Sequence, residues 1–340
     1  GTKNTAIGRG VLNANTTADN NTGVGYFALV SNTTGASNTA VGSIALDANT
    51  TGAKNVALGY AALTDNTTGS NNVAIGENCL ADNTTANNNV AIGMDALRLN
   101  TTGTNNTAVG NECLKSITTN SYCTAVGDFA LATNTSQYMT AFGTQALGDN
   151  TTGENSTALG FRALRLNTTG SKNTAVGYDA LYTPTTANSN TAVGYYALRL
   201  NTTGYQCVAI GQNALSANTT GIVNVAIGAE ALDANSTGSK NIAIGKGALS
   251  WNTTADNNIG IGWDALLENT TGTNNTAVGG QALQSVTTGG QNTAVGYQAL
   301  QDNTGGNNTA VGKQALTNNT GADYNTAVGS NALSANTNTS

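Results

Sequence analysis

Histidine is absent from this 340-residue chain, and charged residues make up only 9% of it. Without histidine, Ser-His-Asp and Cys-His catalytic sites and metal sites built on imidazole are excluded. The eighteen carboxylates show no recurrent pairing, and no basic cluster is present to bind the phosphates of a nucleic acid. We therefore expect no enzymatic activity, no cofactor, no metal site and no nucleic-acid partner.

Long apolar runs are also missing, so no segment reaches the roughly 20 residues that a membrane-spanning helix needs. No signal peptide is recognisable, and the chain opens with Gly1-Thr2-Lys3. The first and last repeats resemble the interior ones, whereas repeat proteins need polar terminal caps. These features favour an uncapped excerpt of a longer fibre.

A glycine recurs along the whole chain, and this recurrence is the strongest signal present. Twenty glycines are spaced by seventeen residues, except for two spacings of sixteen, Gly127 to Gly143 and Gly296 to Gly312. The repeated unit reads approximately N-T-A-V-G-x-x-A-L-x-x-N-T-T-G-x-x. A short fixed period predicts a solenoid in which each repeat forms one coil. Rows of equivalent residues are numbered from the repeated glycine, so that row +4 lies four residues after it.

The expected fold class is all-β: a parallel β-solenoid of 20 coils, about 17 residues each, in a single repeat domain over residues 1–340. In N-T-A-V-G, Thr and Val or Ile alternate with Asn, Ala and Gly, which is typical of a strand. The A-L-x-x stretch could form a second short strand or one helical turn. The N-T-T-G stretch has the residue types of a turn. Asn in rows −4 and +7 is expected to form hydrogen-bonded ladders between coils.

Apolar side chains occupy fixed rows, and these rows predict the core. Row +4 is Leu in all twenty repeats, and row −1 is Val, Ile or Leu in nineteen. All thirty charged residues fall in rows +1, +2, +5, +6, +11 and +12, which we expect to face water. The predicted core combines both apolar rows, with representatives Leu12, Leu29, Leu46, Leu232, Val41 and Ile227.

Row −2 is Ala in eighteen repeats and never holds a residue larger than alanine. Because each coil owns only two sizeable apolar side chains, the core of one chain is small. Small residues along a whole face indicate close approach of another backbone, so we expect self-association, most simply as a parallel homotrimer. The alternative is a single-chain solenoid whose alanine row packs on its own opposite wall.

The strings at Asn38–Gly42 and Asn224–Gly228 are similar to the head repeats of trimeric autotransporter adhesins. The longer unit at Asn292–Leu300 more closely resembles repeats of bacterial and phage tail-fibre proteins. This resemblance implies a left-handed β-roll, assembly as a trimer, and a location outside the cell, at the cell surface or on a virion. The seventeen-residue unit departs from the adhesin pattern by being longer.

Sixteen of the seventeen aromatic residues lie in the charge-tolerant rows. Phe161, Tyr178 and Tyr195 follow the glycine in three successive repeats, and Tyr196 stands beside the last. We expect these four residues to form a surface stripe. The stripe could cover a seam between chains, or it could bind sugar rings or an apolar surface, with glycans or a cell surface as partners.

Four cysteines are too far apart along the stack to pair, because a disulfide needs Cα atoms within about 7 Å. They are interpreted as buried thiols, with contact between equivalent cysteines across a trimer axis as the alternative. Fourteen asparagines of row +7, such as Asn49, begin an Asn-x-Ser/Thr sequence, and these sequences arise from the repeat itself. They would invite glycans only in a secreted eukaryotic chain.

The sequence favours a structural extracellular fibre, an adhesin head or stalk that acts as a rigid rod for surface attachment without catalysis. An ice-binding solenoid is the alternative, because stacked Thr side chains can form a flat, regular face. Val or Ile interrupts the Thr of row −3 in seven repeats, which disfavours ice binding. A carbohydrate-binding tail fibre is a further alternative.

Overall fold

The computed structural model describes residues 1–336 and confirms the parallel β-solenoid, with one three-residue strand in each repeat. No helix occurs among these residues. The chain divides into two compact units, residues 1–169 and 170–340. The strands of the first unit are β1 (Thr5–Ile7), β2 (Thr22–Val24), β3 (Thr39–Val41), β4 (Val56–Leu58), β5 (Val73–Ile75), β6 (Val90–Ile92), β7 (Thr107–Val109), β8 (Thr124–Val126), β9 (Thr140–Phe142) and β10 (Thr157–Leu159). Those of the second are β11 (Thr174–Val176), β12 (Thr191–Val193), β13 (Val208–Ile210), β14 (Val225–Ile227), β15 (Ile242–Ile244), β16 (Ile259–Ile261), β17 (Thr276–Val278), β18 (Thr293–Val295), β19 (Thr309–Val311) and β20 (Thr326–Val328).

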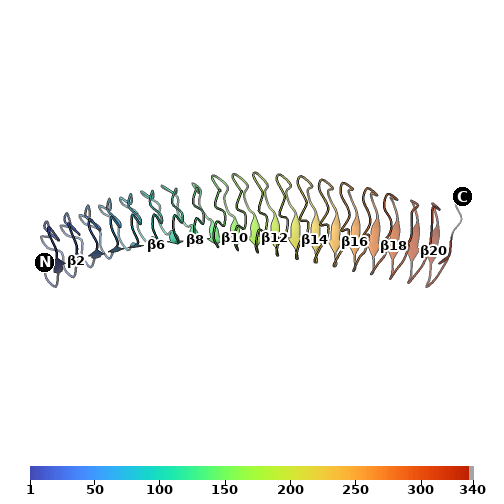
Figure 1. Cartoon of the computed structure of the whole chain (residues 1–340), viewed down its shortest axis with the longest axis horizontal. Coiled ribbons are helices and arrows are strands. Elements are labelled where there is room, and N and C mark those ends of the chain that lie inside the picture. Colours follow the sequence, from blue (N-terminus) through green and yellow to red (C-terminus); the bar gives the residue numbers. More distant parts are fainter. Residues whose placement is uncertain (337–340) are drawn as a thin grey trace. The chain divides into compact units, whose positions relative to one another are not determined.

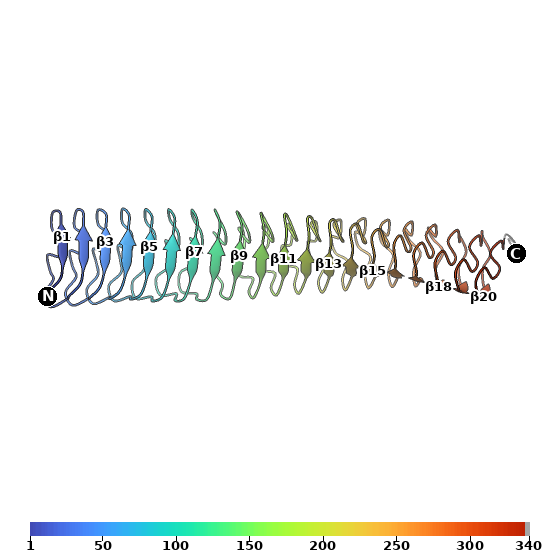
Figure 2. The same cartoon turned by 90° about the horizontal axis from the view of Figure 1, so that it is seen from below.

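Within each unit the strands stack side by side along one edge of the coils, and the turns and loops lie on the other side (Figure 1). Figure 2 shows the strand-bearing side of the first unit. Neighbouring strands pair in parallel and in register, so that Val208 of β13 faces Val225 of β14. The short repeat ending at Gly143 keeps this register, because Val126 still pairs with Phe142. Its missing residue is therefore absorbed in the loop.

The A-L-x-x stretch forms a tight turn, so neither the second strand nor the helical turn expected from the sequence is present. Within one coil, Asn235 N donates to Leu232 O at 3.1 Å and closes the turn. Between coils, Leu232 N donates to Ala248 O at 3.0 Å. Backbone hydrogen bonding between coils thus continues well beyond the three strand residues.

Positive φ angles recur in several rows of the repeat, among them the glycine row and the leucine row. Gly228 has a φ of 135°, and a Cβ built there would lie 2.5 Å from the carbonyl oxygen of Gly245, so only glycine fits this corner. Every leucine of row +4 also has a positive φ, for example 52° at Leu232. A left-handed backbone costs a non-glycine residue about 1–2 kcal/mol, which the burial of the leucine side chain offsets.

The leucine row fills the interior of each coil, as predicted. Leu29, Leu46 and Leu232 are fully buried and Leu12 is 9% exposed. The alanines of row −2 line the wall opposite, which is why that row stays small. A Cβ built at Gly260, which takes the alanine position in β16, would lie only 3.3 Å from the Leu249 Cγ of the preceding coil.

The prediction that row −1 belongs to the core is wrong. Val41 and Ile227 are half-exposed, and no member of this row is buried in the described structure. The strand has an inward-facing alanine at its centre, so both flanking side chains must point outward. The interior wall opposite the leucine row is lined by the small alanines of row −2, so the larger side chains of row −1 lie outside the coil.

Buried asparagines complete the interior with two ladders of hydrogen bonds, as expected. In row −4, Asn38 N donates to Asn21 Oδ1 at 2.8 Å, and Asn38 Nδ2 donates to Gly52 O at 2.8 Å. In row +7, Asn49 Nδ2 donates to Asn32 Oδ1 of the preceding coil at 2.7 Å and to Gly52 O of its own loop at 3.0 Å. Ile117, Pro184 and Val286 interrupt this row, and the break at Val286 leaves the buried Oδ1 of Asn269 without a donor.

Candidate functional site

The outward side chains of rows −3 and −1 form one continuous surface on each unit, which we call the strand face. Row −3 contributes Thr, Val or Ile, and row −1 contributes Val, Ile, Leu or Phe. No charged residue falls in either row. Parallel, in-register pairing aligns equivalent side chains at spacings of about 4.8 Å. The strand face is therefore regular, apolar to weakly polar, and free of charge.

The strand face is most apolar over β13–β16, where both rows are aliphatic in four successive coils. Ile210, Ile244 and Ile261 expose 39%, 37% and 36% of their surface. The eight side chains extend about 14 Å along the stack, at three coil spacings of about 4.8 Å. Contiguous exposed apolar surface of this kind marks interaction sites in soluble proteins. The block consists of Val208, Ile210, Val225, Ile227, Ile242, Ile244, Ile259 and Ile261.

The alanine row does not provide a surface for another chain, contrary to the expectation from its small side chains. Ala226 and its equivalents in the interior coils are fully buried inside their own coil. The alternative drawn from the sequence, in which this row packs on the chain's own opposite wall, is the arrangement found. A contact between copies would therefore use a different face, and the strand face is one exposed apolar surface of the chain.

The predicted aromatic stripe is partly assembled in the second unit. The rings of Tyr178 and Tyr195 stack with centroids 5.4 Å apart, and those of Tyr195 and Tyr196 lie 3.9 Å apart. We call these three residues the aromatic cluster. The neighbouring Tyr196 hydroxyl raises the pKa of Tyr195. Phe161 belongs to the first unit, where the Arg162 guanidinium lies 4.8 Å from its ring centroid.

The charged side chains beside the aromatic cluster already interact with other residues of the same chain. The Arg199 guanidinium lies 4.3 Å from the ring centroid of Tyr196, and its Nε is 3.9 Å from Asp179 Oδ2. Asp179 is fully buried, so the expectation that row +2 faces water is wrong at this residue. Arg199 thus packs against the Tyr196 ring and neutralises the Asp179 carboxylate. Whether the aromatic cluster binds a ligand or covers a seam stays a prediction.

The cysteines and the repeated Asn-x-Ser/Thr sequences face inward. All four cysteines are free and fully buried, so none can meet its equivalent in another chain. Burial raises the pKa of Cys79 and of Cys113 to about 12. Asn49 is also fully buried, and its Nδ2 donates to Asn32 Oδ1 at 2.7 Å. That amide is therefore inaccessible to a glycosylating enzyme once the chain has folded.

Comparison with models of known protein families and with curated proteins finds no match to this sequence. Residues 1–336 contain no group of three or more Cys, Asp or Glu side chains placed to hold a metal ion. No helix in that part of the chain is long and apolar enough to cross a membrane.

Proposed function

We propose that this chain is a non-catalytic structural segment of an extracellular or surface fibre, built by lateral association of identical chains through the strand face. The observation that carries the proposal is the outward, charge-free position of rows −3 and −1. Burying such a surface against a second copy removes apolar area from water at about 25 cal/mol per Å². No desolvation of charge opposes this gain, because all charged residues lie in other rows.

A parallel homotrimer is the arrangement we propose. Identical chains in parallel register present the same rows at the same height, so aliphatic blocks meet aliphatic blocks along the assembly. Closed rotational symmetry buries the same face of every copy and stops growth at a defined size. The choice of three chains, the left-handed coil and the surface location rest on the resemblance to adhesin heads and tail fibres. In this role the assembly would hold a binding element or a cell at a distance.

Charge placed on the strand face tests the proposal. Ile227→Lys puts an ammonium group in the aliphatic block, and sedimentation equilibrium should show a shift from trimer to monomer. Ser216→Lys is the matched control, since row +5 already holds Lys115 in another coil, and it should keep the native mass. Far-UV circular dichroism should be unchanged in both variants. A monomeric native chain, or an unchanged mass of Ile227→Lys, would contradict the proposal.

Ice binding is a second candidate, and one observation favours it. The Thr of row −3 and the Val of row −1 share the outward face in a regular, in-register array, as in β11 and β12. Val or Ile replaces Thr over β4–β6 and β13–β16, which breaks that array. Thermal hysteresis measured on the monomeric Ile227→Lys variant separates the two roles, because self-association would cover the face in the native assembly.

A further inference from the structure

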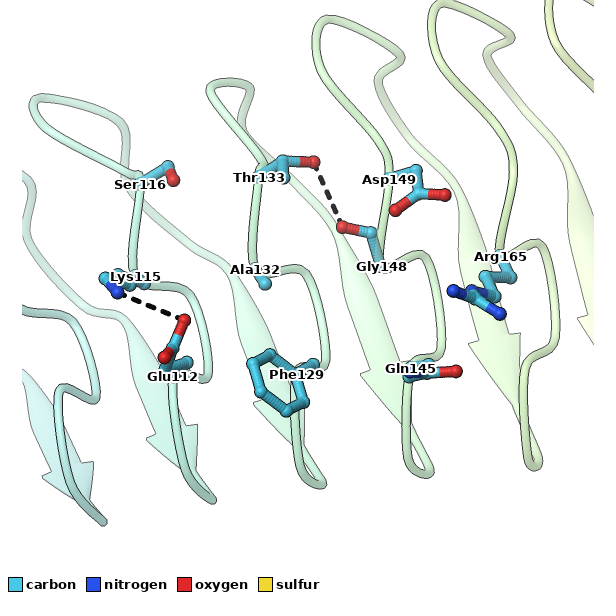
Figure 3. A pocket seen from close by; sticks show the side chains of 10 residues that line it. All are labelled: Glu112, Lys115, Ser116, Phe129, Ala132, Thr133, Gln145, Gly148, Asp149 and Arg165. Atoms are coloured by element: carbon cyan, nitrogen blue, oxygen red, sulfur yellow. Dashed lines mark hydrogen bonds and ion pairs between the residues drawn. The ribbon is translucent and has the colours of Figure 1, made fainter.

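A hollow with a volume of about 410 Å³ opens on the first unit, away from the strand face (Figure 3). Its lining comes from rows +2, +5 and +6 of four successive coils. This volume lies within the range of about 300–1,000 Å³ that is usual for small-molecule sites. The four coils span three spacings, or about 14 Å along the stack. The hollow is thus elongated.

Two consecutive small residues create the floor of the hollow. Row +5 reads Lys115, Ala132, Gly148 and Arg165 in these coils, so a cationic side chain stands at each end and nothing protrudes between them. No other pair of successive coils has Ala or Gly twice in this row. The hollow is therefore a local departure from the repeat and not a feature of every coil.

The walls combine one aromatic ring with several polar groups. Figure 3 shows Phe129 and Gln145 on one side of the floor and Thr133 and Asp149 on the other. Among residues 1–336, no hydrogen bond or ion pair is found for the Gln145 amide or the Asp149 carboxylate. Both groups are free to bind a ligand.

The Gln145 amide differs in this respect from other amides in the same row. In the second unit, Gln298 Nε2 donates to Gln281 Oε1 at 2.9 Å, and Gln314 Nε2 donates to Gln298 Oε1 at 2.9 Å. Row +2 can therefore satisfy its own amides by pairing between coils. At Gln145 the preceding coil offers Phe129 instead, so the amide has no such partner in its row.

The charges of the hollow balance. Lys115 Nζ lies 3.1 Å from Glu112 Oε2, and Arg165 and Asp149 add one further charge of each sign. A cationic ligand would meet a cation at both ends of the floor, and an anionic ligand would meet the Asp149 carboxylate. Donors and acceptors alternate beside an aromatic ring, which suits a neutral ligand rich in hydroxyl groups.

We propose that this hollow binds a neutral oligosaccharide. The Phe129 ring stacks against the apolar face of one sugar ring, and the Gln145 amide and Asp149 carboxylate bind neighbouring hydroxyls. Thr133 accepts a further hydroxyl hydrogen bond, because its own hydrogen is directed to Gly148 O at 3.0 Å. The proposal gives the fibre a recognition site and rests on its surface location, but it does not depend on the strand face.

Two variants and their matched controls test the site, with binding measured on an array of neutral hexose oligosaccharides that also carries uronate and amino-sugar glycans. Gly148→Arg fills the floor with a side chain that row +5 already holds at Arg165, and Ser216→Arg makes the same addition elsewhere in that row. Phe129→Asn removes the ring at a φ of 55° that asparagine tolerates. Phe27→Asn, at a φ of 56°, is its control.

The native chain should bind the neutral oligosaccharides, and saturation-transfer NMR should show transfer from the aromatic protons of the chain to the sugar that is weaker in Phe129→Asn. Both test variants should weaken binding by about tenfold or more, which corresponds to about 1.4 kcal/mol, because one fills the floor and the other removes the stacked ring. Both controls should bind normally. The proposal is overturned if the native chain binds no neutral oligosaccharide or prefers the charged glycans. It is also overturned if folded Phe129→Asn binds as well as the native chain. Sedimentation mass is read on every variant, so a failure of the hollow and a failure of self-association are distinguishable.

Discussion

Asn235 is the residue where the internal ladder can be tested most cleanly. Its Nδ2 donates to Asn218 Oδ1 at 2.9 Å and to Gly238 O at 3.0 Å, and its Oδ1 accepts from Asn252 Nδ2 at 2.9 Å. Asn235→Ala removes these three hydrogen bonds, at about 1 kcal/mol each. It also leaves the Asn218 Oδ1 buried without that donor, which costs about 1–3 kcal/mol more. We expect a loss of about 4–6 kcal/mol.

Equilibrium urea unfolding followed by far-UV circular dichroism measures this loss. Asn257→Ala is the control, because Asn257 is exposed and its side chain makes no hydrogen bond in the described structure. Its backbone φ of 59° makes a cost of about 1–2 kcal/mol expected from the left-handed conformation alone. Equal losses in the two variants would refute the ladder as a source of stability.

One natural break in the row +7 ladder, at Val286, offers the reciprocal change. Val286 is fully buried, and Asn269 Oδ1 lacks the donor that an asparagine at this position would supply. Val286→Asn should restore the row and raise the free energy of unfolding by about 1 kcal/mol, despite the lost burial of a valine. Destabilisation, the ordinary result of putting an amide into an apolar site, would contradict this reasoning.

Three further predictions concern packing, thiol chemistry and pH. Leu232→Ala should lower the free energy of unfolding by about 2–5 kcal/mol, whereas Ile227→Ala in the monomeric state should cost less than about 1 kcal/mol; urea unfolding compares them. Because burial raises the pKa of Cys79 to about 12, iodoacetamide at pH 8 should label the unfolded chain and spare the folded one, as read by mass spectrometry. Burial raises the pKa of Asp233 above its ordinary value of 3.8, so the folded state binds this proton more tightly than the unfolded state. Stability should therefore rise as the pH falls through the folded pKa of Asp233 toward 3.8, and thermal melts of Asp233→Asn should lack this contribution.

The repeat alone was enough to predict the fold class, the asparagine ladders between coils and the buried leucines. Leu232 could be assigned to the core because a packing constraint applied in every coil leaves an invariant residue. Ile227 was assigned wrongly by the same logic. Invariance shows that a position is constrained, but it does not distinguish an interior wall from an exterior face that other chains cover.

The alternation in the strand held the information needed to avoid that error. Ala226 and Ile227 are adjacent in a strand, so they cannot both face the interior. The choice between them depends on the space inside the coil, which is set by the leucine across it. That space depends on the left-handed backbone conformation of Leu232. Leucine rarely adopts this conformation, so it could not be predicted from the residue types.

Local features of the surface arise where residues depart from the repeat. Ala132 and Gly148 are visible in the sequence as two small residues in succession, and this signal could have indicated the hollow. Its depth could not be predicted, because it depends on how far the side chains of rows +2 and +6 rise beside the floor. The burial of Asp179 was likewise hidden, since its row accepts charge on the outside in other coils.

Photo-crosslinking tests the central claim most directly, namely that rows −3 and −1 are the surface through which copies of this chain associate. The photoreactive residue p-benzoylphenylalanine is placed at Ile227 on the strand face in one sample and at Ser216 in another, and both are irradiated and separated by mass. The account predicts covalent dimers and trimers, in multiples of 34.0 kDa, from position 227 and little product from position 216. Monomer alone from position 227, or equal yields from both positions, would contradict it.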